Sequence, residues 1–153
     1  TDADPEVLVA IGELSTSIGA ADITEVEMVT TTADKSEGFT ISVRVRYNEP
    51  VDVVTTGGTP TLAVTNSNAG SGSGRGPHSL SYASGTGTNE LIFSLAIAAA
   101  NAATNADDVL TVGAQTIALN SGTIKDASGT ASDAALVISG AVGTAAGSVT
   151  VTA

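Results

Sequence analysis

Cysteine and tryptophan are absent from this 153-residue chain, and basic residues are scarce. Without cysteine, no disulfide bond can stabilise the fold. Five Lys and Arg residues stand against 16 Asp and Glu residues, which gives a formal net charge of −11. Binding to a nucleic acid requires a basic face that attracts phosphate groups. We therefore expect no nucleic-acid partner.

Aromatic residues make up only 3% of the chain, so the core is expected to consist of Val, Ile, Leu and Ala. No run of about 18 apolar residues is present, and the sequence therefore predicts no membrane-spanning helix. The chain also opens without the basic and apolar regions of a signal peptide. This opening suggests a fragment of a larger protein.

The acidic character of the chain allows two interpretations. Carboxylates keep a protein soluble, notably in a salty environment where their mutual repulsion is screened. Alternatively, carboxylates gather in loops because they bind hard cations through oxygen. Composition alone leaves both open.

Alternating apolar and polar residues dominate the sequence, whereas helical periodicity is weak. From Phe39 to Tyr47 the odd-numbered residues are apolar or aromatic, which is typical of a strand with one buried face. Similar runs, separated by Gly, Asn, Asp and Ser, predict seven to nine strands in one antiparallel β-sandwich domain spanning residues 1–153. A final strand or an exit linker is expected at Gly147–Ala153, and at most a short helical turn at Ala96–Ala103. The segment Pro5–Leu14 suits either a strand or a short helix.

One low-complexity insertion interrupts this pattern at Asn66–Ser79 (NSNAGSGSGRGPHS). It is either a spacer without further function or a loop that contacts a ligand. Clustered glycines let backbone N–H groups approach an anionic group closely, and arginine adds a charge-assisted hydrogen bond. The candidate ligand-binding residues are therefore Gly72, Gly74, Arg75 and Gly76.

Four motifs occur in series along the chain: YNEPV, TPTLAV, YASGTGTNELIF and GTIKDASG, which begin at Tyr47, Thr59, Tyr82 and Gly122. In this order and spacing they resemble the immunoglobulin-like repeats of large calcium-dependent RTX adhesins of bacteria. The resemblance covers about residues 22–138. It implies an all-β, immunoglobulin-like Greek-key sandwich located outside the cell, on the bacterial surface.

A sandwich brings alternate loops to opposite ends, and both ends of this one are expected to be rich in oxygen ligands. One end is predicted to gather Glu49, Asp52, Glu90, Asp126 and Asp133, and the other Asp34, Glu37, Asn101, Asn105, Asp107 and Asp108. Calcium takes six to eight oxygen ligands. The predicted calcium ligands are Glu49 with Asp126 at the first end, and Asn105, Asp107 and Asp108 at the second. A zinc site is not expected, because His78 is the only histidine and the chain has no cysteine.

No catalytic arrangement is recognisable, so we expect a protein that is not an enzyme. A Ser-His-Asp triad would have to use His78 within the Gly- and Ser-rich insertion, where it would be poorly oriented. The glycines from Gly70 to Gly76 lack the Lys-Ser/Thr of a phosphate-binding loop.

Two functional hypotheses follow from the resemblance. Some adhesin modules bind the free C-termini of peptides or proteins through calcium, which would serve cell attachment or biofilm formation, and the insertion and the second acidic cluster favour this role. Other repeats are structural extenders whose junctions with neighbouring adhesin domains are stiffened by calcium. Binding of glycans is a third alternative, which the scarcity of aromatics disfavours.

Overall fold

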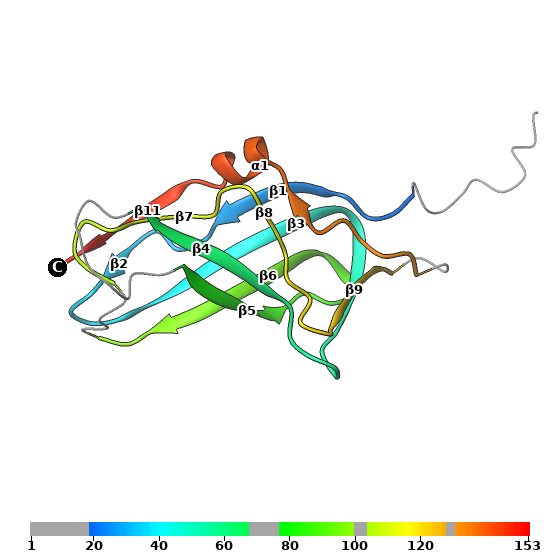
Figure 1. The fold of residues 1–153 in the computed structure, drawn as a ribbon, viewed down its shortest axis with the longest axis horizontal. Coiled ribbons are helices and arrows are strands. Elements are labelled where there is room, and N and C mark those ends of the chain that lie inside the picture. The colour runs from blue at the N-terminus through cyan, green and yellow to red at the C-terminus, as the bar shows by residue number, and fades with distance from the viewer. Residues whose placement is uncertain (1–18, 68–76, 100–103, 128–130) are drawn as a thin grey trace, which may run out of the picture.

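The computed structural model describes residues 19–67, 77–99, 104–127 and 131–153. β-Strands dominate these ranges, so the prediction of an all-β protein is confirmed (Figure 1). The elements are β1 (Ile23–Met28), β2 (Ala33–Asp34), β3 (Phe39–Val54), β4 (Thr61–Ser67), β5 (His78–Ser84), β6 (Thr88–Ile97), β7 (Val109–Thr111), β8 (Gln115–Thr116), β9 (Thr123–Asp126), β10 (Val137–Ile138), α1 (Gly140–Ala145) and β11 (Ser148–Thr152). The predicted ligand-binding residues Gly72, Gly74, Arg75 and Gly76 lie outside the described residues.

The strands form one large curled sheet and one small sheet. The order in the large sheet is β1-β3-β6-β5-β4-β7-β11-β2, with β9 paired to the far end of β3, while β8 and β10 form the small sheet. Every pairing is antiparallel except that of β11 with β2, which is parallel. The expectation of a purely antiparallel arrangement was therefore wrong at this edge. The long axes of the strands follow the long axis of the molecule (Figure 1).

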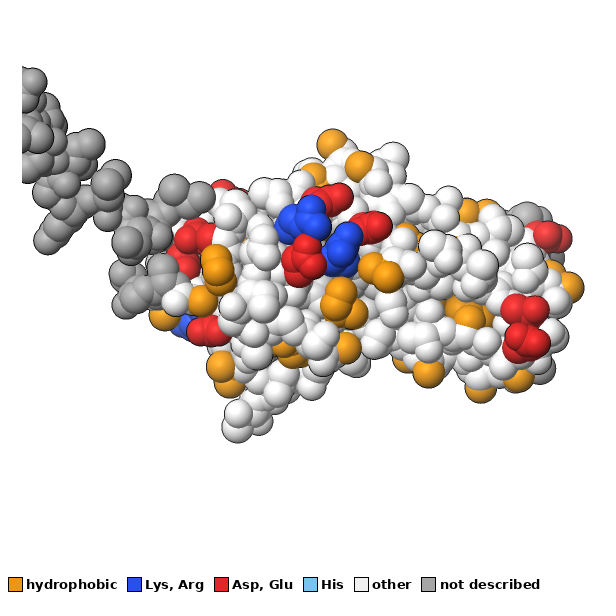
Figure 2. Space-filling view, turned by 180° about the vertical axis from the view of Figure 1, so that it is seen from behind, with side chains coloured by type: hydrophobic (Ala, Val, Ile, Leu, Met, Phe, Trp, Pro, Cys, Tyr) orange, Lys and Arg blue, Asp and Glu red, His pale blue; other side chains and the backbone are white. Residues whose placement is uncertain are grey.

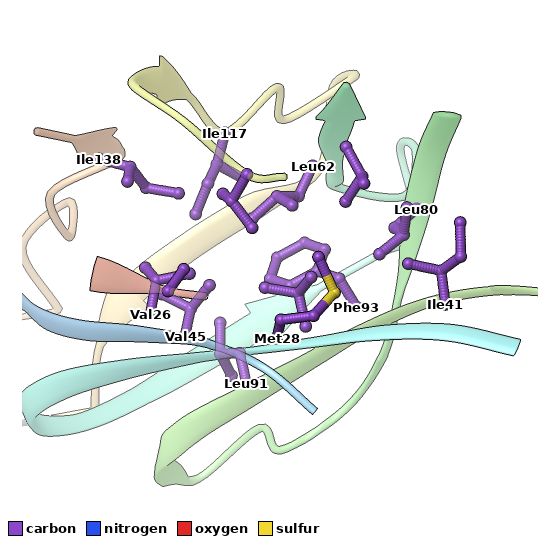
Figure 3. Packing of buried hydrophobic residues seen from close by; sticks show 14 of the residues in the cluster. Val26, Met28, Ile41, Val45, Leu62, Leu80, Leu91, Phe93, Ile117 and Ile138 are labelled. Atoms are coloured by element: carbon purple, nitrogen blue, oxygen red, sulfur yellow. The ribbon is translucent and has the colours of Figure 1, made fainter. Parts of the chain in front are cut away.

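The two halves of the curled sheet enclose a single hydrophobic core. Val26, Val45 and Leu91 reach it from β1, β3 and β6, and Leu62 reaches it from β4 on the opposite side (Figure 3). Phe93 contacts Tyr82 edge-on, with 6.1 Å between ring centroids. Removing these apolar side chains from water is the main force that holds the two halves together. The core is mainly aliphatic, as the composition predicted, with Tyr47 and Phe93 as its buried aromatic residues.

Strand β3 is long because it changes partner along its length. Along one edge it pairs with β1 as far as Tyr47 and with β9 from Val51 onward, while β6 pairs with its other edge as far as Arg46 and again at Val51. The register shifts between Arg46 and Val51, where Pro50 has no N–H to donate to a neighbouring strand. Glu49 therefore lies at the point where β3 passes from one partner to the next.

The one helix in the described residues, α1, lies where no helix was predicted. The Ser139 hydroxyl caps its first turn by accepting from the Val142 N–H at 3.3 Å. A Cβ at Gly143 would lie 2.1 Å from the Gly113 carbonyl oxygen, so only glycine allows the helix to approach this turn so closely. The expected final strand is confirmed by β11. Of the segment Ala96–Ala103, where at most a short helical turn was expected, Ala96 and Ile97 belong to β6, and residues 100–103 lie outside the described residues. Within the described ranges, no helix has the length and hydropathy that a membrane span requires.

Candidate functional site

Glu49 and Asp126 lie together at the end of the molecule where the described chain begins. Glu49 occupies an inward-facing position of β3, between the buried residues Tyr47 and Val51. Asp126 faces inward from β9, is only 2% exposed and is paired with Val51 in the ladder. The structure thus brings together two residues that the sequence analysis had assigned to one calcium site. We call this region, with Asp22, the carboxylate end.

The electrostatic environment of Glu49 is unfavourable for an isolated negative charge. Its pKa is raised by burial in the first place, and further by the charges of Asp126 and Asp22. Its Oε1 atom is shielded from solvent and receives no hydrogen bond in the described part of the structure. Lys125, the basic residue next to Asp126, instead pairs with Asp133 at 3.3 Å. Among the described residues, this carboxyl group therefore has no positive partner of the kind that burial of a charge requires.

Asp22 is the member of this group that sequence analysis missed. Its backbone N–H donates to Asn48 Oδ1 at 2.8 Å, and its carbonyl oxygen accepts from the Asn48 N–H at 3.0 Å. These bonds fix Asp22 to the residue directly before Glu49. No sequence motif marks Asp22, because its position results from a contact between segments 26 residues apart.

The opposite end of the molecule contains the second predicted group, Asn105, Asp107 and Asp108, in one turn. Asp108 is completely buried, and its Oδ2 accepts from the Asn105 N–H at 2.8 Å and from Asn66 Nδ2 at 3.4 Å. Asp107 is exposed and adopts a left-handed conformation with φ of 68°, and its N–H donates to the Val151 carbonyl at 2.8 Å. The two adjacent carboxylates thus lie in different environments, one inside the domain and one outside.

Buried polar side chains surround Asp108, and we call this region the histidine end. It consists of Asn66, His78, Thr104 and Asp108. The insertion suggested a loop position for His78, but it is the first residue of β5 and only 5% exposed. Burial lowers the pKa of His78, and the nearby Asp108 charge partly opposes this effect. The alternation His78-Leu80-Tyr82 could have revealed this inward position.

The outer face of β1, β3 and β6 carries the most prominent group of charges. Arg46 pairs with Glu25 and with Glu90, both at 2.6 Å, and Arg44 pairs with Glu27. Figure 2 shows these side chains gathered on an otherwise largely uncharged face. The expectation that Glu90 lies in an acidic end was wrong, because cross-strand pairing places it opposite Arg46. All five side chains are partly exposed, so these ion pairs add little to stability.

The best-formed hollow on the surface lies away from both ends. A shallow hollow of about 400 Å³ lies between β1 and α1, bordered by Val26, Val142 and Ala145. None of the predicted site residues lines it. In the described residues, no three His, Cys, Asp or Glu side chains are close enough to form a metal site by themselves. An ion at either end would therefore also need amide, hydroxyl, backbone or water ligands.

Comparison with known proteins identifies no relative of this chain. No protein-family model matches the chain, and neither the curated proteins nor the solved structures contain a match.

Proposed function

We propose that the chain is a calcium-dependent, immunoglobulin-like module of a bacterial surface adhesin, with a structural and binding role rather than an enzymatic one. The order of the strands supports the immunoglobulin-like part of this proposal. Strands β4, β5 and β6 are successive neighbours, and β3, which precedes them, lies beside β6. A Greek key has neighbours of this kind, so the strand order supports the proposal, as does the resemblance of the four sequence motifs to adhesin repeats.

The observation that carries the calcium proposal is the carboxylate end. Three carboxylates approach one another there, and the buried Oε1 of Glu49 has no hydrogen-bond donor in the described residues. A divalent cation would remove the repulsion and satisfy this oxygen. Calcium suits the group, because it accepts carboxylates, amide oxygens and waters in flexible geometry. Glu49, Asp126 and Asp22 would hold the ion, with the remaining ligands from backbone and water.

The position of this end favours the role of a structural extender. The described chain begins at the carboxylate end, and its C-terminus lies at the other extreme of the long axis (Figure 1). An ion bound by Asp22, Glu49 and Asp126 would fasten the segment that leads into β1 to the ends of β3 and β9. It would thereby stiffen the connection to a neighbouring adhesin domain.

Binding of peptide or protein C-termini is the second candidate, and the exposed Asp107 supports it. Asp107 lies in a left-handed turn at the end of the molecule opposite to the carboxylate end. A calcium ion held there with an open coordination position would accept a terminal carboxylate. Peptides with free C-termini should then bind in calcium, and amidated peptides should not. Capture of glycans alone would favour the carbohydrate alternative.

Isothermal titration with calcium tests the main proposal. We expect binding by the wild-type chain, and a loss of affinity of at least about tenfold in Glu49→Gln and Asp126→Asn, because each removes a charged ligand. Asp133→Asn is the matched control, since Asp133 is an exposed carboxylate that pairs with Lys125. Undiminished binding in both Glu49→Gln and Asp126→Asn would refute the proposed site.

A further inference from the structure

The polar side chains of the histidine end continue the inward faces of three strands beyond the apolar core. His78 precedes Leu80 on the inner face of β5, and Asn66 follows Val64 on the inner face of β4. Asp108 precedes Leu110 on the inner face of the β7 segment. Because inward residues of paired strands meet, these three side chains converge on the same space between the two halves of the sheet.

Polar atoms of His78 and Thr104 in this region are buried without a hydrogen-bond partner in the described structure. His78 Nε2 and Thr104 Oγ1 are both shielded from solvent, and neither forms a hydrogen bond in the described structure. The two residues are 5% and 0% exposed and come from separate segments of the chain. Buried polar atoms in native proteins nearly always have a partner. Two such atoms, one of them on a histidine close enough to Asp108 for the Asp108 charge to act on it, indicate that a polar or charged ligand belongs in this region.

We propose that the histidine end binds a divalent transition-metal ion such as zinc, with His78 Nε2 and the Asp108 carboxylate as ligands and the Thr104 hydroxyl as a further oxygen ligand. The proposal revises the sequence-based expectation that this chain has too few nitrogen and sulfur ligands for a zinc site. It is independent of calcium at the carboxylate end, which uses none of these residues.

The chemistry of the ligands distinguishes this metal from calcium. Imidazole nitrogen is a common ligand of zinc, copper and nickel, whereas calcium prefers oxygen alone. A ligating histidine must be neutral, and burial lowers the pKa of His78, which keeps the ring neutral near pH 7. The buried position also excludes the many waters that a calcium ion would need to complete its coordination.

The contacts of Asp108 fit the role of a metal ligand. Carboxylates that bind metals are commonly oriented by hydrogen bonds from surrounding groups. Here the Asn105 N–H at 2.8 Å and Asn66 Nδ2 at 3.4 Å hold Oδ2 in place. Asn66 is therefore a positioning residue, and loss of such a residue typically weakens metal affinity about 10–100-fold.

The composition of the chain allows an unambiguous test. His78 is the only histidine and there is no cysteine, so nitrogen NMR of the imidazole shows one pair of ring signals. We expect stoichiometric zinc to shift the Nε2 signal strongly and excess calcium to leave it unchanged. An Nε2 signal that does not move at saturating zinc would overturn the proposal and leave an ordered water as the occupant.

Variants extend the test to affinity. His78→Leu should weaken zinc binding at this site at least about tenfold while the strand remains folded, because leucine suits a buried position. Asn66→Ala should weaken it by a similar factor. Glu37→Gln removes an exposed carboxylate at the same end and is expected to bind zinc like the wild type. Equal zinc affinity in His78→Leu and wild type would contradict the proposal.

Discussion

The carboxylate end and the histidine end are built in the same way but contain different chemistry. In both, a polar side chain takes an inward-facing strand position next to apolar core residues: Glu49 lies between Tyr47 and Val51 on β3, and His78 precedes Leu80 on β5. At the carboxylate end, only carboxylates approach one another. At the histidine end, one carboxylate lies among an imidazole, an amide and a hydroxyl group.

This difference determines what can compensate the buried charges and hydrogen-bonding groups at each end. Asp108 accepts hydrogen bonds from the protein itself, whereas Glu49 Oε1 accepts none among the described residues. A group of like charges depends on a cation from outside, but a mixed group supports much of its own burial. The carboxylate end should therefore respond strongly to calcium, and the histidine end should contribute to folding even without metal.

The largest expected effect is the gain in stability from calcium. A ligand that binds only the folded state stabilises it by about 2.7 kcal/mol at a hundredfold excess over its Kd. For a chain of this length, that corresponds to a rise in Tm of roughly 5–10 °C. Calorimetry in millimolar calcium and in chelator measures the difference. Glu49→Gln should lose most of this calcium-dependent rise in Tm, and Asp133→Asn should retain it. Equal Tm values for the wild type in both buffers would exclude calcium binding.

Removal of the Asp108 carboxylate should destabilise the fold in chelator as well as in calcium. Asp108→Ala leaves the partly buried Asn105 N–H without its acceptor, which costs about 1–3 kcal/mol. Denaturant unfolding in chelator gives this value directly. An unchanged midpoint would show that Asp108, like Glu49, serves only a bound ion, and the contrast between the two ends would disappear.

Glu49→Gln should have the opposite effect on the metal-free protein, and this effect should depend on pH. The pKa of Glu49 is raised in the folded state above its ordinary value of 4.5. Its contribution to stability is then complete below pH 4.5 and is lost as the pH rises through the raised pKa. In chelator, the variant should therefore lose less stability than the wild type as the pH rises from 4.5 to 7. Parallel Tm curves for the two proteins would show that burial and neighbouring charges do not act on Glu49.

His78 should give the smallest effect, with the opposite dependence on pH. Its pKa is lowered below the ordinary value of 6.5, so its contribution to stability is present above pH 6.5 and is lost as the pH falls through the lowered pKa. In chelator, the wild type should lose stability below pH 6.5, and His78→Leu should lose less. If the variant is equally sensitive to acid, the loss originates from other groups.

The alternation of apolar and polar residues was sufficient to locate most strands and to show which side chains of the two ends point inward. Glu49 has the same parity as Tyr47, and Asp126 has the same parity as Ile124, so their meeting could be predicted. Alternation does not reveal which strands are neighbours. For this reason Glu90 was placed in an acidic end, although the pairing of β3 with β6 sets it against Arg46.

Other residues were missed because their positions depend on contacts between distant segments. Asp22 reaches the carboxylate end through its bonds to Asn48, and α1 is stabilised by the close approach of Gly143 to the turn at Gly113. His78 was concealed by composition, because the glycines and serines before it suggested that the loop continued. The inward parity of His78 with Leu80 was the available signal.

The parallel pairing of β11 with β2 has a mechanical consequence. Force applied along the long axis would pull β11 lengthwise against β2 and β7. The bonds that resist include those from the Lys35 N–H to the Thr152 carbonyl and from Thr152 Oγ1 to the Ala33 carbonyl, both 3.1 Å. Such bonds are loaded in shear and must break together, whereas a strand peeled from its end loses them one at a time. The rate of forced unfolding would therefore be set at this short edge, far from any calcium bound at the carboxylate end.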